Sequence, residues 1–275
     1  MFSEQADNCF RQLGLRGNPF TSTPDTRFFY PSSQHIKALR HMQYGAENAS
    51  ISLVTGDVGS GKTLLCRMFL KEVKNKMMTA YIFNPLQSEQ DLLRDIYQDL
   101  GGKETSQRSI GEWYKLINEI VIAHARKGKR SVIIIDEAHR LSVRALEILR
   151  LLTNLETEQS KLLTIILVGQ KELEKKLDDV MLFALKQRIS IHIVLKSLSH
   201  KEVIDYVRYR LSIAGARSEL FSPIALKLLA VLSKGIPRVV NKVSERALLA
   251  IFIKEVVQAG IKDIVRSYYE TRHGT

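Results

Sequence analysis

Five short runs of apolar residues mark the first two thirds of the chain, and each has the length of a β-strand. They lie at residues 51–55, 79–83, 131–135, 164–168 and 189–194. The stretches between them place apolar residues with the 3.6-residue period of amphipathic helices, as at residues 89–100, 110–127 and 143–155. Nearly continuous apolar strands that alternate with helices are typical of a parallel sheet covered on both faces. We therefore predict an α/β fold, a three-layer αβα sandwich with a five-stranded parallel sheet.

From Ser199 onward the pattern becomes purely helical. Ser199 and Glu202 have the spacing of a capping box, and Ser222-Pro223 places a cap before a proline at the first helical position. Gly260 separates a last short helix from the one before it. The predicted organisation is an N-terminal arm and helix at 1–48, an αβα domain at 49–196 and an all-helical domain at 197–275.

A glycine-rich segment joins the first predicted strand to the helix that follows it. Residues 56–63 read Gly-Asp-Val-Gly-Ser-Gly-Lys-Thr and fit the phosphate-binding pattern G-x-x-x-x-G-K-[ST] at every fixed position. We expect the three glycines to take positive φ angles, so that backbone N–H groups surround a polyphosphate at the helix N-terminus. Lys62 then contacts the outer phosphates, and the Thr63 hydroxyl binds Mg²⁺. The expected ATP contacts are Gly56, Asp57, Val58, Gly59, Ser60, Gly61, Lys62, Thr63 and Leu64.

Two acidic residues follow the third predicted strand. Residues 132–135 are apolar β-formers, and Asp136-Glu137 comes directly after them in the form of a Walker B element. A carboxylate at this strand tip can hold Mg²⁺ through water, which gives Asp136 its expected role. Glu137 is expected to orient and deprotonate the water that attacks the γ-phosphate. His139 is either a further polar sensor or a surface histidine.

Three more positions are candidates for an ATP-hydrolysing site. Gln170 follows the fourth predicted strand, where its amide could touch the γ-phosphate or the attacking water. Arg188 precedes the fifth strand and is a candidate arginine finger towards a neighbouring subunit, with Lys186 as a competitor. Arg238 begins a helix of the helical domain and could reach the phosphates, so that the nucleotide state changes the angle between the domains.

The N-terminal arm combines turn signals with aromatic residues. Asn18-Pro19 and Thr23-Pro24-Asp25 are turn-forming, while Phe20 and residues 28–30 are aromatic. A helix follows at residues 33–44. Because the arm and this helix precede the phosphate loop, we expect them to flank the base of the nucleotide. The alternative is simple packing on the protein core.

Composition adds a strong positive charge to this picture. The 275 residues are 45% hydrophobic and 25% charged, as in an ordinary globular protein, but the net charge is +12 and the pI is near 9.7. This balance favours an acidic partner such as nucleic acid or an anionic membrane surface. The two cysteines, Cys9 and Cys66, indicate neither a disulfide framework nor a zinc site. No apolar run reaches about 18 residues and the N-terminus is polar, so we expect a cytoplasmic protein without a transmembrane segment.

Taken together, the motifs resemble the AAA+ ATPase family across residues 50–260, and most of all its ExeA/GspA and MshM group. The segments that carry the likeness are 18–20, 23–29, His35, 38–39, 149–157, 167–170 and 235–238. Members of that group are ATPases linked to type II secretion and to biogenesis of the mannose-sensitive haemagglutinin (MSHA) pilus. The resemblance implies a P-loop sheet domain with a helical lid, hydrolysis of ATP with Mg²⁺, and homo-oligomers, as rings or filaments, with active sites between subunits. It also implies envelope secretion or pilus proteins as partners, and a peripheral place at the inner membrane.

Two considerations qualify the pathway. Longer secretion-type members continue into a membrane span and a peptidoglycan-binding domain, which this sequence lacks, so the shorter pilus-type member is the better analogue. The same core also resembles the TnsC/TniB regulators of transposition, which form filaments on double-stranded DNA. In that case Lys103, Arg108, Lys127, Lys129 and Arg130 are the candidate phosphate contacts. The letters Asp-Glu-Ala-His also name a helicase class, but those enzymes need two sheet domains and one is predicted here.

Overall fold

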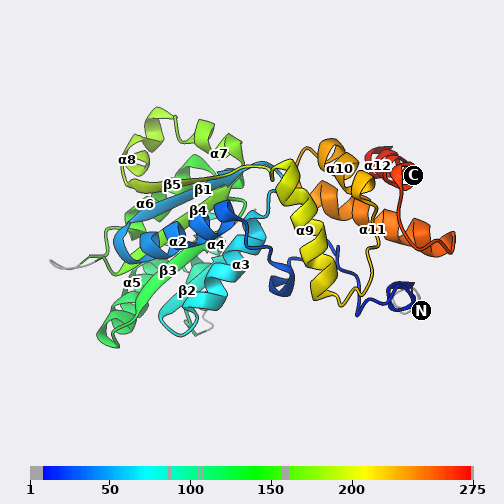
Figure 1. Cartoon of the computed structure of the whole chain (residues 1–275). Helices are drawn as coiled ribbons and strands as arrows, with labels where there is room; N and C mark the ends of the chain where they lie inside the picture. Colours follow the sequence, from blue (N-terminus) through cyan, green and yellow to red (C-terminus); the bar gives the residue numbers. More distant parts are fainter. Residues whose placement is uncertain (1–8, 86–87, 104–105, 107, 157–160, 274–275) are drawn as a thin grey trace. The chain divides into compact units, whose positions relative to one another are not determined.

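The computed structural model describes residues 9–85, 88–103, 106, 108–156 and 161–273. The chain divides into two compact units, which we call the sheet unit and the helical unit. The sheet unit consists of residues 33–58 and 65–195. The helical unit consists of the residues through Ser32, the short segment Gly59–Leu64, and the chain from Lys196 onward. Figure 1 labels the elements of both units.

The sheet unit contains a parallel sheet of five strands in the order β2-β3-β4-β1-β5. The strands are β1 (Ile51–Gly56), β2 (Met77–Ile82), β3 (Arg130–Ile135), β4 (Leu163–Gly169) and β5 (Ile189–Leu195). All five strands that the apolar runs predicted are present, and β2 starts two residues earlier than expected, at Met77. β1, β3 and β4 are almost completely buried, because helices cover both faces of a parallel sheet. The predicted α/β class is therefore confirmed.

Helices cover the two faces of this sheet. They are α2 (Ser33–Asn48), α3 (Lys62–Val73), α4 (Glu89–Asp99), α5 (Ile110–Arg126), α6 (Val143–Leu152), α7 (Lys171–Lys176) and α8 (Phe183–Lys186). Side chains alternate between the faces of a strand. Ile133 and Ile135 of β3 therefore share one core with α4, α5 and α6. On the other side of the sheet α2 lies against β1, β4 and β5. Short 3-10 turns occur at Thr26–Phe28 (η1), Ala138–Arg140 (η2) and Val180–Leu182 (η3).

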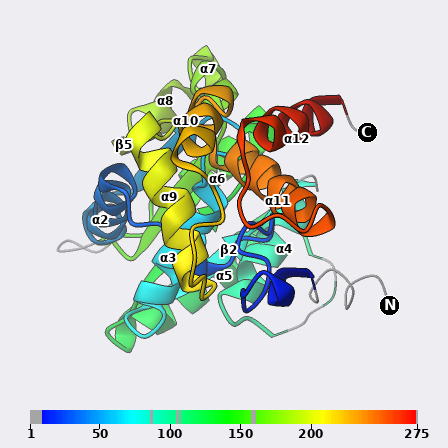
Figure 2. The same ribbon diagram turned by 45° about the vertical axis from the view of Figure 1, so that its right-hand side comes forward.

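Four helices form most of the helical unit, as Figure 2 shows. They are α9 (His200–Ile213), α10 (Pro223–Leu232), α11 (Pro237–Ile253) and α12 (Ile261–His273). The predicted capping box is present: Ser199 Oγ accepts a hydrogen bond from the N–H of Glu202, and the Glu202 carboxylate accepts one from the N–H of Ser199. Pro223 stands in the first turn of α10, where a missing N–H costs nothing.

The N-terminal arm belongs to the helical unit. Phe10, Leu15, Phe20 and Phe28 are buried in the same core as α9, α10 and α11. The rings of Phe20 and Phe221 meet edge to face with their centroids 6.3 Å apart. The boundary thus lies at Ser32, whereas the sequence suggested a single N-terminal part extending to residue 48. The arm and α2 belong to different units, because the aromatic side chains of the arm pack in the core of the helical unit, while α2 packs on the sheet.

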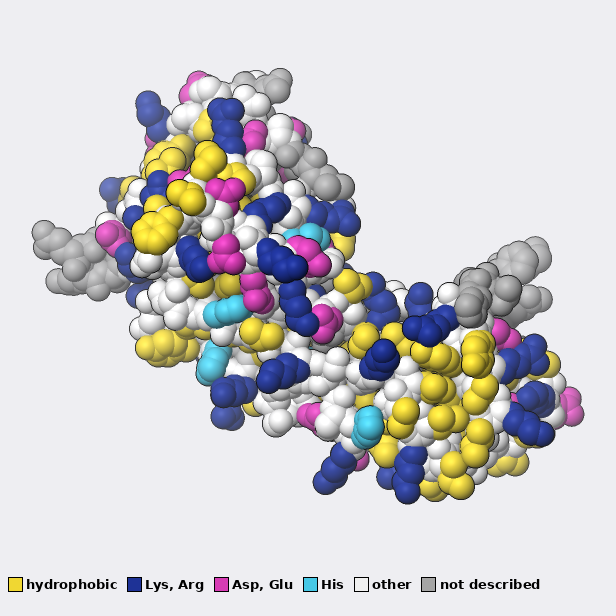
Figure 3. Space-filling view, turned by 90° about the horizontal axis from the view of Figure 1, so that it is seen from above, with side chains coloured by type: hydrophobic (Ala, Val, Ile, Leu, Met, Phe, Trp, Pro, Cys, Tyr) yellow, Lys and Arg dark blue, Asp and Glu magenta, His cyan; other side chains and the backbone are white. Residues whose placement is uncertain are grey.

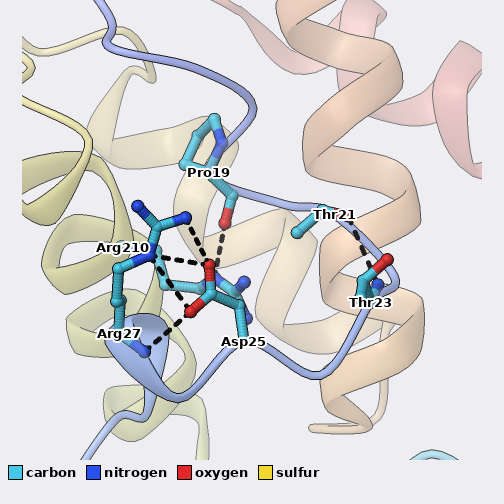
Figure 4. A network of polar contacts seen from close by, with 6 residues as sticks. All are labelled: Pro19, Thr21, Thr23, Asp25, Arg27 and Arg210. Atoms are coloured by element: carbon cyan, nitrogen blue, oxygen red, sulfur yellow. Dashed lines mark hydrogen bonds and ion pairs between the residues drawn. The ribbon is translucent and has the colours of Figure 1, made fainter.

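A buried arginine fixes the arm to α9 (Figure 4). Arg210 is only 3% exposed, and its Nε donates to the carbonyl of Pro19 at 2.5 Å. Its guanidinium also donates to the Tyr206 hydroxyl at 2.6 Å and lies 4.9 Å from the centre of the Phe28 ring. Hydrogen bonds from Arg27 hold the pKa of Asp25 below its ordinary value, and the charge of Arg210 adds to this effect. The turn-forming signature of the arm therefore has a structural role.

Candidate functional site

The glycine loop begins at the end of β1 and ends where α3 starts. Gly56 is the last residue of β1 and Lys62 is the first residue of α3. Gly59 and Gly61 have φ angles of +79° and +102°, which L-residues rarely adopt. Gly56 does not share this conformation, so the expectation of a positive φ there was wrong: it continues the strand and pairs with Leu195. Lys62 is 6% exposed.

The start of α11 contacts this loop within the helical unit. The backbone N–H of Arg238 donates to the carbonyl oxygen of Gly59 at 3.3 Å. A Cβ atom added to Gly59 would lie 2.6 Å from the Cβ of Arg238, which is closer than real Cβ contacts allow. The Arg238 side chain is exposed. The contact with the loop is thus made by the backbone of Arg238. That the Arg238 side chain reaches the phosphates stays a prediction.

The residues before Arg238 explain why the helix can start there. Gly235 has a φ of +71°, and a Cβ at this position would lie 1.9 Å from the carbonyl oxygen of Leu198. The N–H of Leu198 donates to the carbonyl of Gly235 at 2.9 Å, which ties the entry of α9 to the entry of α11. Pro237 then occupies the first turn of α11. The segment Gly-Ile-Pro-Arg is therefore a turn that only glycine can make, followed by a helix start that faces Gly59.

In the sheet unit, several predicted residues gather at one edge of the sheet. The strands are parallel, so the carboxyl ends of β1, β3 and β4 lie at the same edge. Gly56 ends β1, Asp136 follows β3, and Gln170 follows β4. β4 lies between β3 and β1 in the sheet. The ends of β1 and β3 are therefore about 10 Å apart, twice the ordinary spacing between neighbouring strands. This is the position where open α/β sheets bind ligands.

Asp136 is completely buried at this edge. The hydroxyl of Tyr81 in β2 donates to its Oδ2 at 2.9 Å, and the N–H of Glu137 donates to its Oδ1 at 2.9 Å. Burial of Tyr81 and the negative charge of Asp136 raise the pKa of the phenol far above its ordinary value, so it remains a proton donor. Tyr81 was predicted only as part of a strand. The available signal was a phenol hydroxyl near the carboxyl end of a strand that is mostly apolar.

Glu137 lies in the left-handed region, with φ at +55°, which is uncommon for a residue with a side chain. Two of the predicted polar residues lie close to its carboxylate. The Gln170 amide donates to Oε2 at 3.4 Å, and His139 Nδ1 lies 3.4 Å from the same oxygen. The His139 side chain is 15% exposed, so it is not the surface histidine that was one of its two expected readings. The structure thus groups Glu137, His139 and Gln170.

Arg188 lies at the other end of the strands. It immediately precedes β5, so it is near the amino ends of the strands, whereas Asp136 is at their carboxyl ends. Its guanidinium donates to the Thr153 hydroxyl at 2.8 Å. Lys186, the competing candidate, pairs with Asp178 at 2.6 Å. Neither side chain is brought to Glu137 of its own chain, so a role in hydrolysis requires the site of another subunit.

An ion pair at the start of the loop was not foreseen. Asp57 pairs with Lys171, the first residue of α7, at 2.8 Å. The contact joins the residue after β1 to the residue after Gln170 at the carboxyl edge of the sheet. One part of the likeness noted in the sequence, Thr157, lies outside the residues that the structure describes.

Comparisons with known proteins agree with this geometry. Residues 45–177 match the family model described as an AAA domain. The parallel sheet, the glycine loop and the acids after β3 are on that segment or adjoin it, and the chain belongs to the AAA ATPases. It is 40% identical over 259 residues to the General secretion pathway protein A of Aeromonas hydrophila, a match that covers 94% of this chain and 47% of that protein. The resemblance found in the sequence is thereby confirmed, and the chain spans about half the length of that relative.

Solved structures show the same fold at low sequence identity. The ORC2 protein of Aeropyrum pernix, in its ADPNP-ADP complexes, has a TM-score of 0.71 at 15% identity and covers 94% of this chain and 72% of that one. The Cdc6p protein of Pyrobaculum aerophilum has a TM-score of 0.71 at 16% identity, with 92% and 70% covered. The RuvB Holliday junction branch migration motor of Thermotoga maritima gives 0.60 at 16%, with 86% and 68% covered. At these identities the likeness concerns the fold alone.

The contact between Gly59 and Arg238 can be tested with a pair of glycine substitutions. Gly59→Ala adds a Cβ that collides with Arg238, in addition to the strain of a φ of +79°. Gly14→Ala is the matched control, because Gly14 has a φ of +77° but nothing within 4 Å of the added atom. Backbone strain alone costs about 1–2 kcal/mol. We expect Gly59→Ala to lower the stability of the helical unit further and to weaken nucleotide binding about tenfold or more, measured by urea unfolding and fluorescent-nucleotide titration. Equal behaviour of the two variants would contradict the contact.

Proposed function

We propose that this protein binds ATP with Mg²⁺, hydrolyses it as an oligomer, and thereby drives or gates assembly of a secretion or MSHA-like type IV pilus apparatus. The observation that carries the proposal is the carboxyl edge of the sheet, where the phosphate loop begins and where a buried Asp136 adjoins Glu137. Lys62 of the loop and Glu137 after β3, the two residues that the proposed hydrolysis needs most, are both present.

ATP binding in this proposal uses the loop and the start of α3. The N–H groups of residues 59–63 receive the phosphate oxygens, helped by the positive end of α3, a helix of 12 residues. Lys62 adds a positive charge at the outer phosphates. Thr63 would supply a hard oxygen ligand, the type that Mg²⁺ prefers, and Asp136 would hold the ion through water. The bound ion would neutralise charge on the phosphates. Tyr81 orients Asp136 by holding one of its oxygens.

Hydrolysis in this proposal uses the group around Glu137. Its carboxylate accepts a proton from the attacking water, and the left-handed backbone directs its side chain away from the path of the strand. Gln170, which already donates to Glu137, supplies an amide for the water or the γ-phosphate. The Arg238 side chain adds a positive charge at the phosphates, and Arg188 acts in the site of a neighbouring subunit.

The coupling of hydrolysis to movement follows from the loop's contact with α11. Residues 59–64 are part of the helical unit, and the N–H of Arg238 is bonded to Gly59. A change in the phosphate contacts of the loop therefore acts directly on the first turn of α11. The helical unit is in this way the part of the molecule that responds to the nucleotide.

Partners and location are inferred from the relative and from charge. The General secretion pathway protein A of Aeromonas hydrophila gives the secretion assignment, and proteins of an envelope apparatus are the proposed partners besides further copies of this chain. Among the described residues no helix has the length and apolar character to cross a bilayer. We place the protein in the cytoplasm, peripherally at the inner membrane.

The catalytic base is tested by Glu137→Gln. This change keeps the shape of the side chain but removes its ability to accept a proton, so we expect ATP to remain bound while turnover falls about 100-fold or more. ATP affinity by calorimetry and phosphate release measure the two effects. Glu172→Gln, an exposed residue of α7, is the matched control and should keep full turnover. Normal hydrolysis by Glu137→Gln would remove Glu137 from the mechanism.

The role of Tyr81 is tested by Tyr81→Phe, which removes only the hydroxyl that binds Asp136. A hydrogen bond to a charged group contributes about 1.5–3 kcal/mol. We expect ATP binding in the presence of Mg²⁺ to weaken about tenfold, while binding in EDTA stays the same. Tyr114→Phe is the control, because its hydroxyl bonds the Leu151 carbonyl instead. If both variants lost affinity equally, or if the loss persisted in EDTA, Tyr81 would have no part in placing the metal ligand.

A second candidate is a DNA-binding ATPase that regulates transposition, similar to TnsC/TniB. It is favoured by the net charge of +12 and by the basic turn at residues 127–130, where Lys127 and Lys129 are exposed. Arg108 lies 3.8 Å from Glu112 and Arg130 bonds the carbonyl of Glu47, so these two cations are partly engaged. The ATPase rate with and without duplex DNA, across a series of salt concentrations, separates the candidates. The secretion proposal predicts no change, whereas strong stimulation that fades with salt supports DNA binding.

A further inference from the structure

One helix of the helical unit has an apolar surface on its outer side. α10 reads Pro-Ile-Ala-Leu-Lys-Leu-Leu-Ala-Val-Leu, and Lys227 is its one charged residue. Ala225, Leu226, Leu229 and Ala230 are buried in the core. Ile224 and Val231, two turns apart, are 61% and 55% exposed. A helix that is apolar nearly all round is expected to be covered on more than one side.

The turn between α11 and α12 lies beside the start of α10 and is also apolar. A bridge between Phe221 and Ala259, with the N–H of Ser222 donating to the Ala259 carbonyl at 3.0 Å, brings the turn to the start of α10. The turn and its flanks expose further aliphatic side chains. Ile253 is 77% exposed, Val256 43%, Val257 79% and Ile261 49%. We call the set Ile224, Val231, Ile253, Val256, Val257 and Ile261 the aliphatic face.

Lysines accompany the aliphatic face. Lys227 lies within α10, Lys234 follows its end, and Lys262 follows Ile261; all three are exposed, and within the described residues none of them is in an ion pair. Residues 196–275 contain 14 lysines and arginines but seven aspartates and glutamates. Figure 3 shows a part of the surface on which yellow hydrophobic side chains and dark blue Lys or Arg side chains are interspersed. Of the acids close by, Asp263 is paired with Lys254 and Glu219 with Arg208, while Glu255 is exposed.

We propose that the aliphatic face docks on the surface of an anionic phospholipid bilayer. The aliphatic side chains enter the boundary between headgroups and acyl chains, and the lysine stems lie along it with their ammonium groups at the lipid phosphates. Each lysine near such a surface adds about 1 kcal/mol of attraction, equivalent to about fivefold in binding. The inference rests on the proposed function only in placing the protein at the membrane.

The chemistry of the face distinguishes a bilayer from other occupants. A second copy that met it across a two-fold axis would bring Lys227 and its equivalents together, and like charges repel. The phosphate backbone of duplex DNA attracts lysines, but it has no apolar surface that could cover Val257 or Ile253. Protein interfaces are enriched in aromatic residues and arginine and depleted in lysine, the reverse of this composition. Aliphatic residues with lysines match a headgroup layer of negative charge.

The test is flotation of the purified full chain with vesicles. Vesicles of phosphatidylethanolamine and phosphatidylglycerol should bind it, vesicles of phosphatidylcholine should not, and salt should weaken the binding. We expect Ile224→Ser with Val257→Ser, and separately Lys227→Glu, each to reduce binding about tenfold. The matched control is Val180→Ser with Met181→Ser, because these side chains are 89% and 71% exposed in the sheet unit and should not contribute.

Three results of the vesicle assay would overturn the inference. They are absence of binding to anionic vesicles, equal binding to neutral vesicles, and equal loss in the control and the aliphatic-face variants. If Ile224→Ser with Val257→Ser changed the oligomeric state instead of vesicle binding, the face would be a contact between copies and the proposal would be wrong. ATP turnover is measured in the same preparations. Turnover without vesicle binding removes this inference alone, whereas vesicle binding without turnover removes the proposed ATPase mechanism alone.

Discussion

The candidate site depends on the hydrogen bonds that stabilise the buried carboxylate of Asp136. A charge taken out of water is costly unless hydrogen bonds replace its hydration. Here the Tyr81 hydroxyl bonds one oxygen and the N–H of Glu137 bonds the other. The second of these bonds is made where the backbone of Glu137 is left-handed. In this conformation the side chains of Asp136 and Glu137 point in different directions. One acid is consequently buried and fixed, while the next is partly exposed beside Gln170 and His139.

A second constraint ties the phosphate loop to the helical unit. Three glycines have conformations or contacts that a side chain would disturb: Gly59 against Arg238, Gly61 with its positive φ, and Gly235 against Leu198. A backbone hydrogen bond thus joins Gly59 to Arg238 in the first turn of α11. The arm adds a further tie, since Arg210 joins Pro19 to α9 and Asn18 donates to Glu245 of α11 at 2.5 Å. Signatures that look functional in the sequence are here partly devices that hold the helical unit together.

The sheet and the phosphate loop could be predicted because their signals are local. Buried parallel strands are continuous apolar runs, and the loop between β1 and α3 has a fixed spacing of glycines, lysine and threonine. Tyr81 could not be assigned a role, because its partner is 55 residues away and depends on the pairing of β2 with β3. The position of the arm could not be predicted either. The aromatic residues at 20 and 28 indicate that the arm packs in a hydrophobic core, but not whether this is the core of the sheet unit or of the helical unit. Arg188 was singled out from its place before a strand, and the direction of β5 decides that it lies away from Asp136.

The central proposal is that the chain binds one nucleoside triphosphate with its metal, using the loop that follows β1 and the acid Asp136 that follows β3. Isothermal titration of the folded chain with ATP, with and without Mg²⁺, and of a Lys62→Ala variant, tests it most directly. The account predicts saturable binding of one ATP per chain, tighter with Mg²⁺, and loss of that binding in Lys62→Ala. Absence of binding by the folded wild-type chain, or unchanged affinity in the variant, would contradict the account.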